Sequence, residues 1–178
     1  AGRFYPSFGL RNDDHQAFTR ARSGLTPRLF LDGAAFGFES HGLNVSAETF
    51  RLGEHGIYGL HAYRSGKLGS IGYLAGGSFR IPEEKAATTG LLPNARALFG
   101  GLSYNRITAL GELDFNGKNS DTMIVYGALY GRIEYGLWLV GEYNFFDGDR
   151  DIANGVDEFV RFSAEFYPIP FVELRTSL

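Results

Sequence analysis

Cysteine is absent from this chain of 178 residues. Its absence excludes disulfide bonds, thiolate zinc sites and haem attached through the chain's own thiols. Lysine is rare as well and occurs only at Lys67, Lys85 and Lys118. The formal net charge is -3 and the pI is about 5.8, so the chain is not a strongly basic nucleic-acid binder.

Long apolar runs are also missing, and no continuous apolar stretch is long enough for a membrane-spanning helix. The first residues, from Ala1 to Tyr5, lack the charged and apolar regions of a secretory signal peptide. We therefore expect either that a signal peptide has been removed or that these residues were internal to a longer chain.

Glycine and aromatic residues are abundant instead. The chain has 25 glycines and is 15% aromatic, both high against ordinary globular proteins. Hydrophobic residues make up 44% of the chain, yet the mean hydropathy is -0.14. Apolar and polar residues are therefore interleaved along the sequence and are not separated into blocks.

The interleaving has a period of two. From Asn105 to Phe115, every second residue is mainly apolar, and the residues between them include Arg106, Glu112 and Asp114. A strand sends successive side chains to opposite faces, so this pattern predicts a strand with one apolar and one charged face. The same pattern recurs in segment after segment.

Turn residues divide these segments into roughly ten or eleven expected strands. Tight turns are expected at His41–Asn44, Ser65–Lys67 and Tyr167–Pro170, with longer polar loops at Pro82–Pro93 and Asp147–Val156. The expected strands are Arg3–Leu10, Pro27–Ser40, Val45–Leu52, Ile57–Arg64, Leu68–Ile81, Ala95–Tyr104, Arg106–Asn116, Thr122–Tyr135, Leu137–Phe146, Glu158–Tyr167 and Phe171–Leu178.

These features favour an all-β fold, a transmembrane antiparallel up-and-down β-barrel of the bacterial outer membrane, as a single domain over residues 1–178. A soluble barrel or sandwich is the alternative, because periodicity alone does not tell the inside from the outside. Aromatic residues near strand ends, such as Tyr104 and Tyr135, favour the membrane.

If the apolar faces meet lipid, the charged side chains face the barrel interior. They would either line a pore and set its electric field, or form a ladder of satisfied arginine–carboxylate pairs. The signs nearly balance, so no strong ion preference is predicted. The expected pore-lining residues are Asp32, Glu48, Arg64, Arg80, Arg96, Arg106, Glu112, Asp114, Arg132, Glu134, Glu142, Arg161, Glu165, Glu173 and Arg175.

The N-terminal sequence Gly2-Arg3-Phe4-Tyr5-Pro6-Ser7-Phe8-Gly9-Leu10, followed by Asp14-His15 and Ala17-Phe18-Thr19-Arg20, resembles a segment of large bacterial porins. It is similar to the phosphate-selective porin group, in which such a strand leads into a loop with an aromatic-Thr/Met-x-Arg stretch. The resemblance covers about the first twenty residues. It implies that the chain is the C-terminal part of a larger barrel, a fragment, or one product of a split.

Two departures limit what the resemblance implies. Phosphate selectivity in that group rests on clustered lysines, whereas the three lysines here all lie near expected loops, so this selectivity is not carried over. Outer-membrane barrels usually end on an aromatic residue, whereas this chain ends at Leu178, so we expect an incomplete C-terminus.

Two polar clusters invite a catalytic or metal-binding interpretation. Asp13-Asp14-His15 could act with His41, His55 or His61, but these histidines fall on separate turns and strands. Asp147–Asp151 has the start of a calcium loop but lacks the glutamate at the required spacing. Solvated loops explain both better, so we expect no enzyme, no cofactor and no metal.

The leading functional hypothesis is a porin-like channel for passive diffusion of small hydrophilic solutes. The alternative is a non-transport barrel that serves as scaffold or anchor in an envelope assembly, and a rim-active enzyme is a weaker third. Expected partners are membrane lipids, small hydrophilic solutes and either a second copy or other envelope proteins, with no nucleic acid.

Overall fold

The computed structural model describes residues 2–4, 7–10, 31–52, 54–83, 94–117, 122–134, 136–148, 155–169 and 172–178. Within these residues the regular secondary structure consists of strands, with no helix. No helix there has the length and apolar character that crossing a membrane would require.

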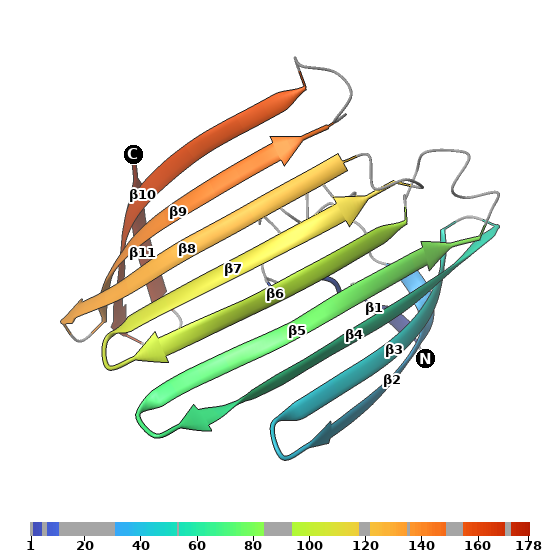
Figure 1. Ribbon diagram of the computed structural model, residues 1–178, viewed down its shortest axis with the longest axis horizontal. Coiled ribbons are helices and arrows are strands. Elements are labelled where there is room, and N and C mark those ends of the chain that lie inside the picture. Colours follow the sequence, from blue (N-terminus) through green and yellow to red (C-terminus); the bar gives the residue numbers. More distant parts are fainter. Residues whose placement is uncertain are drawn as a thin grey trace.

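Eleven strands form one sheet in which each strand pairs antiparallel with its neighbour along the chain. Figure 1 shows the sheet curving, with β1 and β11 behind the middle strands. The strands are β1 (Gly2–Phe4), β2 (Leu31–Ser40), β3 (Leu43–Leu52), β4 (His55–Leu68), β5 (Ile71–Pro82), β6 (Ala95–Tyr104), β7 (Ile107–Asn116), β8 (Thr122–Glu134), β9 (Leu137–Asp147), β10 (Val156–Ile169) and β11 (Val172–Ser177).

The prediction of an all-β, antiparallel up-and-down architecture is confirmed. The expected closed barrel is not formed by these residues. In the described part of the chain, β1 pairs with β2 and β11 pairs with β10, so the sheet is open at both edges.

Tight turns join the strands at one end of the sheet. His41 and Gly42 connect β2 to β3 with φ angles of 48° and 78°, and Asn105 has a φ of 53° between β6 and β7. Positive φ at these positions matches the twist of an antiparallel hairpin. The expected turn at Ser65–Lys67 is wrong, because these residues continue β4 and the chain reverses at Gly69.

The opposite end of the sheet carries the longer connections, between β5 and β6, β7 and β8, and β9 and β10. Figure 1 shows the two ends clearly, with narrow hairpins on one side. From residue 82 onward, longer connections at this end therefore alternate with very short ones at the other, whereas β3 and β4 are joined here by only two residues.

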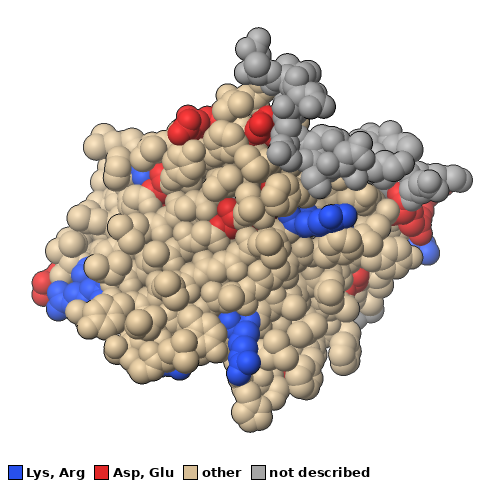
Figure 2. Space-filling model, in the orientation of Figure 1, with Lys and Arg blue, Asp and Glu red and all other residues tan. Residues whose placement is uncertain are grey.

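The two faces of the sheet differ in chemistry. The convex face, seen in Figure 2, shows a broad area with few charged side chains. Leu98, Leu102 and Phe162 lie on it and are at least 60% exposed. On the concave face, buried side chains include both apolar Ile124 and charged Asp114. The apolar stripe of each strand is therefore exposed on the convex face, and polar groups are gathered within the curve.

Two turn glycines provide a test of how backbone geometry limits this sheet. We expect Gly136→Ala to destabilise the fold by at least ~2 kcal/mol, because φ is +77° and the new Cβ would lie 2.5 Å from the carbonyl oxygen of Tyr167. Gly69→Ala is the control, since φ is +62° there but no atom lies within 4 Å. It should cost only about 1 kcal/mol. Urea unfolding in detergent micelles measures both, and equal losses would contradict the argument.

Candidate functional site

The concave face gathers most of the charges that the sequence assigns to the interior. Register decides this, because directly paired residues of neighbouring strands point to the same face. Glu142 pairs with Arg161, and Glu165 pairs with Arg175, in neighbouring rows of one face. The residues that share the concave face are Glu48, Arg80, Glu112, Asp114, Arg132, Glu142, Arg161, Glu165 and Arg175.

Three of the expected interior residues lie on the convex face, and the prediction is wrong for them. Arg96 pairs with Phe79 and Phe115, and its guanidinium lies 5.6 Å from the centre of the Phe79 ring. Asp32 and Arg64 lie on this face too. The cause is the period of two, since a charge an even number of residues from an exposed apolar side chain shares its face.

The remaining three expected residues are not assigned to the concave face. Arg106 lies in the turn between β6 and β7 and donates from Nη1 to the carbonyl oxygen of Ile133 at 2.9 Å. Glu134 lies at the end of β8, beyond a register shift that follows Arg132. Glu173 belongs to β11, but its side chain lies outside what the structure describes.

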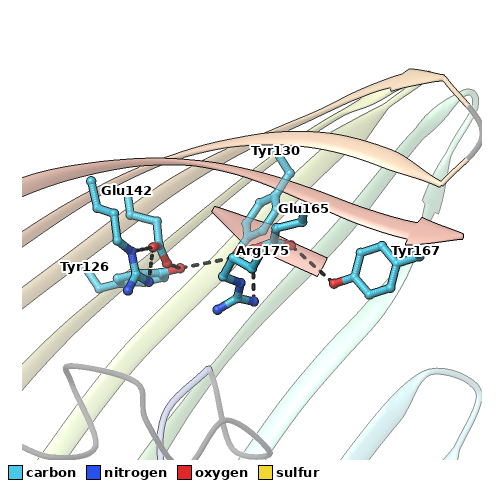
Figure 3. Close-up of polar contacts among 7 residues, drawn as sticks. Tyr126, Tyr130, Glu142, Glu165, Tyr167 and Arg175 are labelled. Carbon is cyan, nitrogen blue, oxygen red and sulfur yellow. Dashed lines mark hydrogen bonds and ion pairs between the residues drawn. The ribbon is translucent and has the colours of Figure 1, made fainter. Parts of the chain in front are cut away.

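A polar ladder crosses β8, β9 and β10 on the concave face (Figure 3). Arg161 donates from Nε to Oε2 of Glu142 at 2.6 Å, and its Nη2 forms an ion pair with the same oxygen. The hydroxyl of Tyr126 donates to Oε1 of Glu142 at 3.0 Å and lies 3.2 Å from the hydroxyl of Tyr130. Both oxygens of this carboxylate are thus occupied.

A second pair extends the ladder to the β11 edge. Nη2 of Arg175 lies 3.0 Å from Oε1 of Glu165, and the hydroxyl of Tyr167 donates to Oε2 at 3.3 Å. Figure 3 shows these side chains pointing into the space that the curved sheet encloses. On the same face, the guanidinium of Arg132 lies 5.9 Å from the Trp138 ring.

The two partners of each ion pair differ in their exposure to solvent. The side chains of Glu142 and Glu165 are only 3% and 10% exposed, whereas those of Arg161 and Arg175 are 40% and 41% exposed. The carboxylates therefore lie next to the wall and the guanidinium groups reach toward the enclosed space. Such a surface can offer hydrogen-bond donors and charge to a passing polar solute.

A second cluster forms where residues 7–10 lie against the concave face. The backbone N–H of Ser7 donates to Oε2 of Glu48 at 3.0 Å, and that of Gly9 donates to Oγ of Ser78 at 3.0 Å. Between them, Phe8 is 2% exposed and the guanidinium of Arg80 lies 5.1 Å from the centre of its ring. We call Ser7–Leu10 the inner segment.

The inner segment also contributes apolar packing. Phe8 joins a buried apolar cluster inside the curve, and Leu10 packs against it. The other members of the cluster are Phe50, Ile57, Ala95, Ala97 and Phe99. The segment therefore occupies part of the space enclosed by β3 to β6 and narrows it.

The sequence prediction missed the inner segment because it extended the first strand to Leu10. The strand β1 ends at Phe4 instead. Pro6 was the available signal, since proline lacks the N–H that a strand ladder needs. The positive φ of 73° at Gly9 is a second reason why these residues leave the sheet.

One substitution in the inner segment should widen the space inside the curve. Gly9 has a φ of +73°, which a β-branched residue strongly disfavours, and a Cβ there would also overlap Oε1 of Glu112, so Gly9→Val should lift Ser7–Leu10 from the concave face. We expect faster hydrogen exchange at the backbone amides of residues 7 and 9, which donate to Glu48 and Ser78 in the unchanged protein. Gly37→Val is the matched control, because the nearest atom there is 4.0 Å away. Equal exchange rates of these amides in both variants would contradict the contact of the inner segment with the concave face.

The polar clusters considered for catalysis or metal binding are not assembled in the described residues. Asp13-Asp14-His15 lies outside them. Nδ1 of His61 lies 2.7 Å from Oγ of Ser78, and Nδ1 of His41 lies 2.8 Å from Oγ of Ser40. No group of three or more histidine, aspartate or glutamate side chains suited to a metal ion occurs in the part of the chain described.

Of the loop Asp147–Val156, the structure describes residues 147–148 and 155–156, so the expectation that it is a solvated loop without calcium stays a prediction. Compared with protein-family models, curated proteins and solved structures, the chain matches none of them. The physical arrangement of the two faces is therefore the basis for assigning a function.

Proposed function

We propose that this chain forms part of the wall of a bacterial outer-membrane β-barrel, which provides a porin-like passive route for small hydrophilic solutes. The observation that carries the proposal is the placement of the two faces. Large apolar side chains are exposed on the convex face, while charged pairs lie within the curve. A soluble barrel has the reverse arrangement.

Exposure of the apolar face supports contact with lipid. Leu98, Leu129 and Phe162 come from three different strands and are 65%, 56% and 63% exposed. Soluble monomers rarely expose so many large apolar side chains together on one surface. Strands β2 to β10 contain 10 to 14 residues, which suits the roughly 9–11 residues that a tilted strand needs to cross a bilayer.

The concave face supports a polar route. The half-exposed guanidinium groups of Arg161 and Arg175 would meet solutes, while their buried glutamates hold them against the wall. The inner segment would then narrow the route beside Arg80 and Glu48. Tight hairpins at one end of the sheet and longer connections at the other correspond to the periplasmic and outer sides of such barrels.

A scaffold or anchor in an envelope assembly is the second candidate. It is favoured by the inner segment, because Phe8 and the apolar cluster fill part of the enclosed space instead of leaving it open. If this filling continued across the barrel, the wall would anchor other proteins and would conduct no solute.

The orientation of the wall can be tested with single cysteines, since the chain has none of its own. In lipid vesicles, Leu98→Cys and Leu129→Cys should resist a charged, water-soluble thiol reagent. Arg132→Cys on the concave face should react. The reverse pattern would overturn the membrane assignment, whatever the barrel transports.

The pore itself is tested by conductance in planar bilayers, using the barrel that this wall forms once strands are paired to both of its open edges and that resists unfolding by SDS at room temperature. Stepwise currents are expected, and the charged reagent should reduce them in Arg132→Cys but not in Leu98→Cys. A correct labelling pattern without any current would favour the scaffold over the pore.

A further inference from the structure

Both edges of the sheet are open. Among the described residues, the backbone of β1 pairs with β2, and that of β11 pairs with β10. In a hydrocarbon environment, backbone N–H and C=O groups need partners, so lipid-exposed sheet edges do not occur within a bilayer. A wall that crosses the membrane must therefore acquire strands at both edges.

Strand direction decides which strands can pair with both open edges. Eleven strands lie in sequence order and each is antiparallel to the next, so β1 and β11 run in the same direction. Direct pairing of β1 with β11 would be parallel, whereas the strand pairs of the described sheet are antiparallel. Only an odd number of added strands makes both new junctions antiparallel.

A second copy of these strands does not meet this condition. Copies inserted in the same sense are related by rotation about the membrane normal, which preserves the direction of every strand. Because β1 and β11 share one direction, any edge of one copy would meet an edge of the other in parallel. Association of two copies through their convex faces is a separate matter and would leave the edges open.

We infer that the barrel is closed by an odd number of further antiparallel strands, from polypeptide outside these eleven. This inference rests on the proposed membrane-spanning wall. The added strands must be apolar toward the side of Leu174, which is 59% exposed, and polar toward the side of Arg175. The half-exposed guanidinium at this edge favours a carboxylate or amide side chain on the facing strand.

The experiment adds strands of known direction to the C-terminus of this 178-residue chain through a short glycine-asparagine turn. Copies of residues 122–169 (β8–β10) and 95–169 (β6–β10) add three and five strands. They begin and end on strands that run opposite to β11 and β1. Copies of residues 137–169 (β9–β10) and 107–169 (β7–β10) are matched controls that add two and four strands.

Closure is measured by electrophoretic mobility in SDS with and without boiling, and by resistance to trypsin in lipid vesicles. We expect a compact monomer that boiling unfolds only for the chains with three or five added strands. Closure of the unextended chain, closure with two or four added strands, or failure of both odd extensions would overturn the inference. So would an SDS-resistant assembly of unextended copies.

The outcome is separable from that of the proposed function. A closed, trypsin-resistant barrel with three or five added strands that passes no current would reject the pore. It would leave intact the inference that an odd number of added strands closes the barrel. Currents from the unextended chain would support the pore and reject the inference that added strands are needed for closure.

Discussion

Leu98→Arg is expected to destabilise the protein in lipid vesicles by about 2–4 kcal/mol, because an arginine near the middle of a lipid-facing strand must enter hydrocarbon. Leu98 lies on the convex side of β6 and is 65% exposed, so the substitution disturbs little packing. Urea unfolding from vesicles measures the change. In a soluble protein, a substitution at so exposed a position would shift stability by only about 0.5 kcal/mol in either direction.

Tyr104→Arg is the matched control for Leu98→Arg. Tyr104 lies on the same strand and face and is 61% exposed, but it is the last residue before the turn. Near the interface the cost of arginine falls to about 0–1 kcal/mol. A large loss at Leu98 beside a small loss at Tyr104 supports lipid contact. Small, similar losses at both positions would show that the convex face is in water.

Strand order and pairing direction could be predicted from the sequence because the period of two is nearly unbroken. Ile107–Asn116 alternates except at Leu110, and the structure places Glu112 and Asp114 in the curve while Ile107 is exposed on the convex side. Local pattern suffices here because neighbouring strands are also neighbours along the chain. Each hairpin then needs only a turn, such as Asn105 with its positive φ.

The errors have two physical causes. The charge of Arg96 predicts an interior position, but Arg96 and Leu98 are two residues apart on one strand and therefore share the convex face; here register outweighs polarity. The inner segment depends on contacts between Gly9 and Ser78, or Ser7 and Glu48, which are far apart in sequence. A period-of-two pattern describes neighbouring strands and contains no information about such packing inside the curve.

At the candidate site, too, some features could be predicted from the sequence and others could not. The sequence identified Glu142, Arg161, Glu165 and Arg175 as charges on one face, and the structure joins them in pairs. It did not show that each carboxylate is buried while its arginine stays half-exposed, since that depends on side-chain direction and on the tyrosines beside them. The near balance of charge in the sequence therefore says little about the charge that a solute would meet.

Arg161→Ala should cost about 1–3 kcal/mol, because it leaves the buried carboxylate of Glu142 without its ion-pair partner. The loss stays below that of a fully buried pair, since the arginine side chain is 40% exposed. The tyrosine hydrogen bond to Glu142 remains. Arg161→Lys should recover part of the loss but not the paired contacts of the guanidinium. Urea unfolding in detergent micelles measures the series.

In the proposed pore, the same substitution should shift the reversal potential in the direction of cation selectivity, because a positive charge that faces the enclosed space is lost and the carboxylate of Glu142 is uncovered. Arg96→Ala removes the same side chain from the convex face, so it should leave the reversal potential unchanged. Replacing both Arg161 and Glu142 by leucine should restore stability, since no buried charge is left without a partner. If Arg161→Ala and Arg96→Ala gave the same stability and the same reversal potential, the ladder would be neither a structural support nor part of the solute route.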